Sequence, residues 1–120
     1  MVFLHGFLEN KSIWDSFADV LSASFRVLQI DLPGHGDSDV IADCHSMELM
    51  ADAVAGVCEH EGVEDFVLIG HSMGGYVSLA LLRKFPQRVK ALVLFHSHAS
   101  ADTPEASESR LRTIEVVKKE

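Results

Sequence analysis

The sequence predicts an α/β fold in which a parallel sheet is covered by helices on both faces. Short apolar segments rich in β-branched and aromatic residues alternate with longer segments whose apolar residues recur at helical spacing. The segment 66–69 is apolar throughout, and the lack of alternation indicates a strand buried on both faces. Strands that alternate with helices require right-handed crossovers, and therefore a parallel sheet.

The elements are expected in a regular order along the chain. The expected strands are 1–4, 25–30, 66–69 and 89–95, and the expected helices are 13–23, 47–61, 76–83 and one that opens at Pro104. Ser12 is expected to cap the first helix in a capping box with Asp15. Its predicted buried face comprises Ile13, Phe17, Val20 and Leu21, with Trp14 at the edge. Ser46 is expected to cap the second helix, which Gly62 ends.

The stretch from Gly70 to Gly75 has the pattern of a nucleophile elbow. It reads Gly-His-Ser-Met-Gly-Gly, a match to G-x-S-x-G between a predicted strand and a predicted helix. So sharp a reversal strains the backbone at Ser72 and needs small residues around it, which the three glycines provide. The N–H of Met73 would lie at the helix N-terminus, where unpaired donors and the helix dipole favour an anion.

Composition excludes several classes of function. The 120 residues suit a single domain, and the net charge of −8 argues against a nucleic-acid partner. Cys44 and Cys58 form neither a disulfide framework nor a metal-binding CxxC pattern. No signal peptide and no membrane-spanning run is visible, so we expect a cytoplasmic protein without a membrane partner. Neither a dinucleotide fingerprint nor a P-loop is present, and we expect no cofactor.

Three motifs follow one another along the chain: His5-Gly6-Phe7 after the first strand, the turn 31–38 with the sequence DLPGHGDS, and the elbow at Ser72. With these motifs in this order, residues 1–98 or so resemble the α/β-hydrolase fold family. The resemblance implies acyl transfer, with Ser72 as the nucleophile acting on a small-molecule acyl substrate. It also implies an oxyanion hole formed by the backbone N–H groups of Phe7 and Met73.

The chain departs from the family pattern in two places. The strands that precede the His-Gly strand in the family are absent, and so are the downstream loops that carry the acid and the base of the triad. We therefore expect the N-terminal part of the core at 1–98, truncated before the C-terminal strands. A linker and helix at 99–120 resemble the start of a lid. The apolar stripe of that helix, Leu111, Ile114 and Val117, needs a partner surface. Together with an exposed sheet edge, it predicts self-association of the 120 residues.

The sequence leaves three functions open. The first is a serine hydrolase acting on a small ester or a related acyl compound. The second is a lyase of the same fold, similar to the menaquinone-pathway synthases that eliminate pyruvate, for which a cluster of arginines in the pocket would be the sign. The third is a non-catalytic binding module, because a serine without a base is a poor nucleophile.

The remaining histidines and acids are weaker candidates. His5, His71 and His96 are candidate pocket-lining residues, of which His5 is expected to brace its loop and His71 to pack beside the elbow with a surface hydrogen bond. Asp102 is a minor candidate for the acid of the triad. His96 and His98 have no third ligand at a convincing spacing, so no metal site is predicted.

Overall fold

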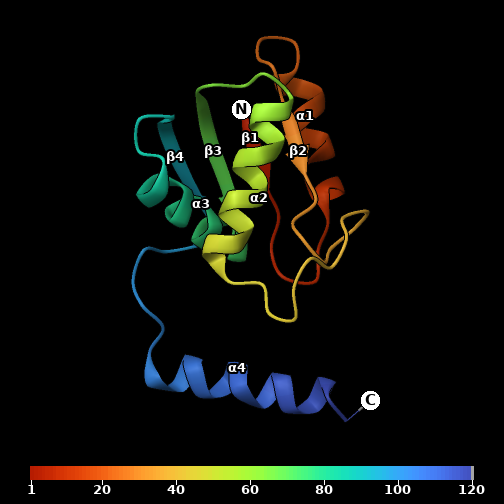
Figure 1. The fold of residues 1–120 in the computed structure, drawn as a ribbon, viewed down its shortest axis with the longest axis vertical. Coiled ribbons are helices and arrows are strands. Elements are labelled where there is room, and N and C mark those ends of the chain that lie inside the picture. The colour runs from red at the N-terminus through yellow and green to blue at the C-terminus, as the bar shows by residue number, and fades with distance from the viewer. Residues whose placement is uncertain (120) are drawn as a thin grey trace.

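Among residues 1–119, which the computed structural model describes, four strands form one sheet. They are β1 (Val2–Leu4), β2 (Leu28–Ile30), β3 (Phe66–His71) and β4 (Val89–Phe95). The strands lie in the order β2-β1-β3-β4 (Figure 1), and each neighbouring pair is parallel. The predicted α/β fold with a parallel sheet is confirmed.

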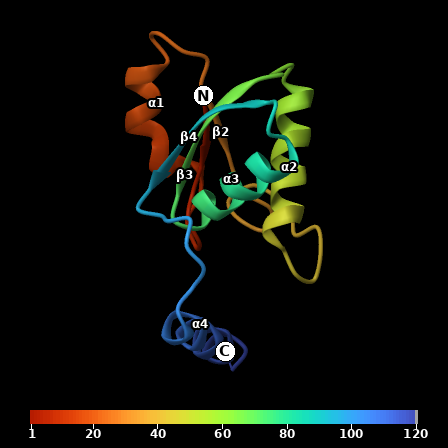
Figure 2. The ribbon, with the colours of Figure 1, turned by 90° about the vertical axis from the view of Figure 1, so that its left-hand side faces the viewer.

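Helices cover both faces of this sheet. The short helix α1 (Asp15–Leu21) lies on one face, while α2 (Met47–His60) and α3 (Met73–Lys84) lie on the other (Figure 2). A fourth helix, α4 (Pro104–Val117), stands apart from these layers, and an extended linker joins it to β4 (Figure 1).

The core divides into two layers because successive strand residues point to opposite faces of the sheet. Val2 and Leu4 of β1 belong to the larger cluster beneath α2 and α3, whereas Phe3 packs with Trp14 and Ile69 on the other face. All three residues of β1 are buried, as expected for an interior strand of a parallel sheet.

The first helix differs most from the prediction. This helical segment starts with a 3₁₀ turn, η1 (Lys11–Trp14), which leads into α1. Asn10 caps the turn, and its side chain accepts the Ser12 N–H at 2.9 Å. Ser12 is therefore not the cap. The buried residue is Trp14, which is 2% exposed, whereas Phe17 is 46% exposed. Of the predicted face, Leu21 packs partly buried against the core cluster, whereas Ile13, Phe17 and Val20 are exposed. The 3₁₀ turn changes the helical phase, so Trp14 takes the buried position.

Other boundaries shift by a few residues. β2 is shorter than the predicted strand 25–30, because the N–H groups of Ser24 and Phe25 donate back to the Leu21 carbonyl oxygen in a turn. α3 begins at Met73, three residues earlier than predicted, so Gly74 and Gly75 lie within it. Ser46 caps α2 as predicted, with its Oγ accepting the Leu49 N–H at 3.1 Å.

Candidate functional site

Ser72 occupies the sharp reversal between β3 and α3 in a strained backbone conformation. Its φ is 48° and its ψ is −114°, values that non-glycine residues adopt rarely. Neighbouring segments hold the residue in place: its N–H donates to the Phe95 carbonyl oxygen at 3.1 Å, and its own carbonyl oxygen accepts the Ser97 hydroxyl at 2.9 Å. Strain that is held in this way is typical of functional sites.

The glycines around Ser72 are required by close backbone contacts. A Cβ atom on Gly70 would overlap the backbone of Gly74, and one on Gly74 would overlap the carbonyl oxygen of Leu4. A Cβ on Gly75 would overlap the side chain of Ser97. The start of α3 therefore lies directly against the strand ends, which is the crowding that the elbow pattern predicts.

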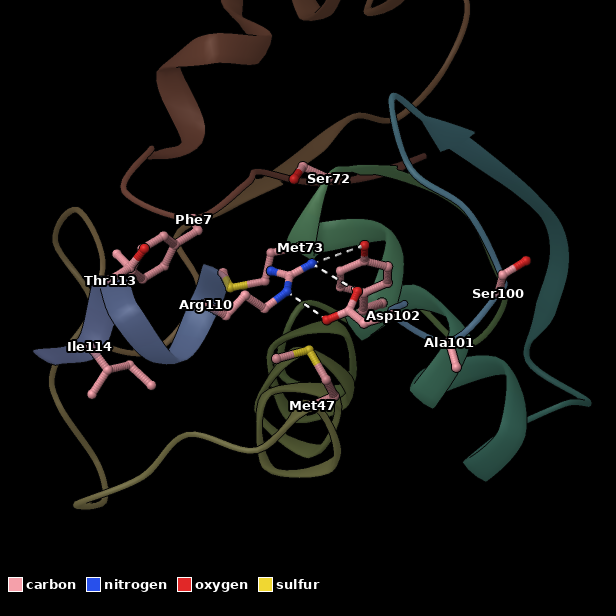
Figure 3. Close-up of a pocket in the computed structure, with 11 residues that line it drawn as sticks. Phe7, Met47, Ser72, Met73, Ser100, Ala101, Asp102, Arg110, Thr113 and Ile114 are labelled. Carbon is pink, nitrogen blue, oxygen red and sulfur yellow. Dashed lines mark hydrogen bonds and ion pairs between the residues drawn. The ribbon is translucent and has the colours of Figure 1, made fainter. Parts of the chain in front are cut away.

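The two candidate oxyanion donors lie on neighbouring segments. β1 pairs with β3 in the register Leu4↔Gly70, so the loop that carries Phe7 leaves the sheet beside the elbow. Met73 is the first residue of α3, and its N–H has no intrahelical acceptor. Phe7, Ser72 and Met73 all line one cavity (Figure 3). The two segments that carry the candidate donors therefore border the same cavity as Ser72.

This cavity lies between the carboxyl end of the sheet and α4. It has a volume of about 690 Å³. Its lining residues are Phe7, Met47, Ser72, Met73, Tyr76, Ser100, Ala101, Asp102, Arg110, Thr113 and Ile114. Most of these side chains are apolar or uncharged, and the charged ones are Asp102 and Arg110. Tyr76 lies four residues after Ser72, one helical turn on, and that spacing could have predicted its position.

Asp102 and Arg110 neutralise each other in the cavity wall. Arg110 Nε donates to Asp102 Oδ2 at 2.6 Å and Nη2 donates to Oδ1 at 3.1 Å. Nη2 also lies 3.4 Å from the Tyr76 hydroxyl (Figure 3). The hydrogen bonds to Asp102 raise the pKa of Arg110. Asp102, which the sequence offers as a candidate for the acid of the triad, is thus paired with an arginine in this structure.

None of the three candidate histidines is among the residues that line the cavity. His5 is fully buried, and its Nε2 accepts the Leu32 N–H at 2.9 Å while Nδ1 lies 2.7 Å from the Gly6 carbonyl oxygen. A neutral ring with Nδ1 protonated satisfies both contacts, and burial lowers the pKa of His5. His5 therefore braces its loop. His96 has a φ of 47°, and its ring packs against Phe95 at 4.8 Å between centroids.

His71 pairs with Glu9. Its Nδ1 lies 2.8 Å from Glu9 Oε2, and the side chain is 23% exposed. This matches the packing role with a hydrogen bond that the sequence suggested, although the partner, Glu9, was not foreseen. Among the hydrogen bonds of residues 1–119, none joins Ser72 Oγ to a histidine or a carboxylate.

Within the described residues no three histidine, cysteine or acidic side chains gather closely enough to hold a metal ion. The same part of the chain contains no helix with both the length and the apolar character needed to cross a bilayer. Burial raises the pKa of the Cys58 thiol, so this cysteine is poorly suited to nucleophilic chemistry.

Comparison with known proteins gives a consistent result. A family model described as alpha/beta hydrolase fold matches residues 1–114. Among curated proteins, the chain is 36% identical over 99 residues to a pimeloyl-[acyl-carrier protein] methyl ester esterase from Nitrosomonas europaea, a match that covers 81% of this chain and 36% of that protein. It is 38% identical over 102 residues to a 2-hydroxy-6-oxononadienedioate/2-hydroxy-6-oxononatrienedioate hydrolase from Paraburkholderia phymatum, covering 78% of this chain and 34% of that protein.

A solved structure is similar over nearly the whole chain. A thermophilic esterase from Thermogutta terrifontis, in a malate-bound form, is 42% identical and superposes with a TM-score of 0.92. The match covers 99% of this chain and 44% of that one. The chain thus spans less than half the length of these relatives.

Proposed function

The chain belongs to the α/β-hydrolase fold family, and from this premise we propose that it supplies the nucleophile and the oxyanion hole of a serine esterase. The observation that carries the proposal is the backbone of Ser72, which has a φ of 48° at the junction of β3 and α3 and borders the cavity. The esterases among its relatives support ester hydrolysis as the reaction type.

In the proposed reaction, Ser72 Oγ attacks the carbonyl carbon of an ester and transfers its proton to a general base. The N–H groups of Phe7 and Met73 stabilise the oxyanion of the tetrahedral intermediate, a contribution of about 3 kcal/mol for one such donor. The intermediate then collapses: the leaving oxygen takes the proton from the base and departs as the alcohol, and the acyl group stays on Ser72. Water, deprotonated by the same base, hydrolyses this acyl group to a carboxylic acid and restores the Ser72 hydroxyl. Among residues 1–119 no base is hydrogen-bonded to Ser72 Oγ, so the proposed reaction needs a base from outside these contacts.

The cavity favours an uncharged ester over a polycarboxylate substrate. Arg110 is the arginine in its wall, and Asp102 neutralises it. Arg83 pairs with Glu48 at 2.6 Å, and Arg88 donates to backbone carbonyl oxygens of the loop before β3. The arginine cluster that a pyruvate-eliminating lyase would need is therefore not supported by these positions, and a small apolar acyl or alcohol group fits the lining better.

The proposal is tested by intact-mass spectrometry of the protein from its native source, before and after treatment with a fluorophosphonate probe. The expected result is a single adduct on Ser72 and a mass above the 13.2 kDa of these 120 residues. Ser72→Ala is the control and should remain unlabelled. A protein that stays unlabelled overturns the proposal in favour of a binding module.

A further inference from the structure

Glu9 links the loop of Phe7 to the elbow of Ser72. Its Oε2 accepts the Gly6 N–H at 2.6 Å, three residues back in the same loop. The same oxygen lies 2.8 Å from His71 Nδ1, on a segment 62 positions away in the chain. A carboxylate oxygen can only accept here, so His71 Nδ1 carries the proton.

The two partners of Glu9 lie next to the two oxyanion donors. Gly6 directly precedes Phe7, and only Ser72 separates His71 from Met73. An oxyanion hole works only when its two N–H groups are held at a fixed separation before the reaction. The carboxylate of Glu9 spans the gap between the segments that carry them.

The contact is built into the packing. A Cβ atom on Gly6 would lie 2.6 Å from Glu9 Oε2 and 3.0 Å from His71 Nδ1, so the bridge occupies the space that glycine leaves open. The His71 ring is also held by aromatic neighbours, with centroids 6.4 Å from Trp14 and 6.1 Å from Phe95.

The charge state of Glu9 strengthens its hydrogen bonds to Gly6 and His71. Burial would raise the pKa of Glu9, but the hydrogen bonds from His71 and from Gly6 N–H outweigh it and hold the pKa below its ordinary value. The carboxylate is therefore ionised at neutral pH, and hydrogen bonds to an ionised acceptor are the stronger kind. Leu8, between Phe7 and Glu9, has a φ of 60°, a strained conformation that the bridge helps to hold.

We infer that Glu9 is a positioning residue that, through His71, sets the separation of the Phe7 and Met73 N–H groups. This role rests on the proposed esterase function for its catalytic consequence. Removing the bridge leaves the nucleophile and the cavity in place and loosens one donor relative to the other. Its removal should therefore weaken stabilisation of the transition state, which lowers kcat, and should leave substrate binding unchanged.

The test uses the full polypeptide and four variants. In Glu9→Ala, kcat for p-nitrophenyl acetate should fall by about tenfold or more with KM unchanged. Glu9→Gln should restore most of the rate, because its amide oxygen can accept from both Gly6 N–H and His71 Nδ1–H, as the carboxylate oxygen does. His71→Phe keeps the aromatic packing, removes the hydrogen bond and should lower kcat as well. Glu59→Ala, at an exposed position of α2, is the matched control and should behave as wild type.

A second readout does not depend on activity. Hydrogen exchange of the Gly6 amide, which donates to Glu9 Oε2, can be followed by NMR and should accelerate in His71→Phe as well as in Glu9→Ala. A purely local turn in the Phe7 loop would not respond to the change at His71. Unchanged exchange in both variants overturns the inference, and so does an unchanged kcat in Glu9→Ala of an active enzyme. If the wild-type protein fails to react with the fluorophosphonate, the esterase proposal fails and the exchange measurement alone decides whether the bridge holds the loop.

Discussion

Gly74 in the first turn of α3 lies directly against the carbonyl oxygen of Leu4 at the end of β1. A Cβ atom at this position would also come within 2.7 Å of the His5 carbonyl oxygen. Both obstacles are backbone atoms and cannot rotate away as a side chain could. The contact holds the start of α3, directly after Ser72, against the end of the strand that leads to the Phe7 loop.

Gly74→Ala should therefore destabilise the protein by about 3 kcal/mol, within the range for an overpacked core position. Gly56→Ala in the middle of α2 is the matched control, because nothing lies within 4 Å of a Cβ built there. That substitution should stabilise the protein by about 0.5–1 kcal/mol through helix propensity. Urea unfolding of the two variants measures both values, and equal effects would contradict the packing at Gly74.

The strain at Ser72 can be measured with two substitutions. Ser72→Gly should be more stable than Ser72→Ala by about 1 kcal/mol, because glycine adopts a positive φ without steric cost. Ser72 makes no side-chain cap hydrogen bond to α3, so neither variant loses a cap. Chemical unfolding of both variants at neutral pH is the measurement. A Ser72→Gly variant less stable than Ser72→Ala would show that the residue is not strained.

Asp31 should make stability depend on acid pH. Burial would raise the pKa of Asp31, but hydrogen bonds from the N–H groups of Asp37 and Lys11 and from the Lys11 ammonium outweigh it and lower the pKa to about 2. A carboxylate with a depressed pKa stabilises the fold above the unfolded-state pKa of 3.8, and this stabilisation is lost as pH falls from about 4 to about 2.

Asp31→Asn should cost about 2 kcal/mol at pH 7 and flatten the loss of stability below pH 4. Unfolding free energies at pH 7, 4 and 3 provide the comparison. Asp43→Asn, which changes an exposed carboxylate, serves as the control and should keep the wild-type profile. If the unfolding free energy of Asp31→Asn falls as steeply with decreasing pH as that of the wild type, groups other than Asp31 cause the acid sensitivity.

Trp14 is well packed but leaves a polar atom unsatisfied. Its ring lies 5.0 Å from Phe3 and 5.8 Å from Phe95 between centroids, while its Nε1 is buried without a hydrogen-bond partner among the described residues. Trp14→Ala should cost about 4 kcal/mol as a large cavity. Trp14→Phe should cost about 1 kcal/mol, because it also removes the unsatisfied donor. Thermal unfolding of the two variants measures both costs in stability. A Trp14→Phe variant as unstable as Trp14→Ala would contradict the prediction.

The exposed apolar stripe of α4 (Leu111, Ile114 and Val117), together with the edge strand β4, should drive self-association of the 120 residues. Leu111 is 60% exposed and Val117 is 64% exposed, and on the edge strand β4 Val93 is 45% exposed. Leu111→Glu should lower the apparent mass in light scattering relative to the wild type. Ser109→Glu adds the same charge at an exposed position about half a turn away and should not. A monodisperse wild-type monomer would contradict the prediction.

Local patterns in the sequence determined most of the architecture and the elbow. The burial of β3 follows from an apolar run without alternation, and the position of Ser72 follows from glycines that only a tight strand-to-helix turn requires. Such signals are readable because period, propensity and turn chemistry act over a few neighbouring residues.

Only the tertiary structure decided which side chains meet. The burial of Trp14 rather than Phe17 depends on a 3₁₀ turn whose phase is set by packing against Phe3. Arg110 of α4 pairs with Asp102 in the linker before that helix. His71 at the end of β3 pairs with Glu9 in the loop after β1. No local pattern encodes such contacts, because they depend on where parallel strands and helices place their ends in space.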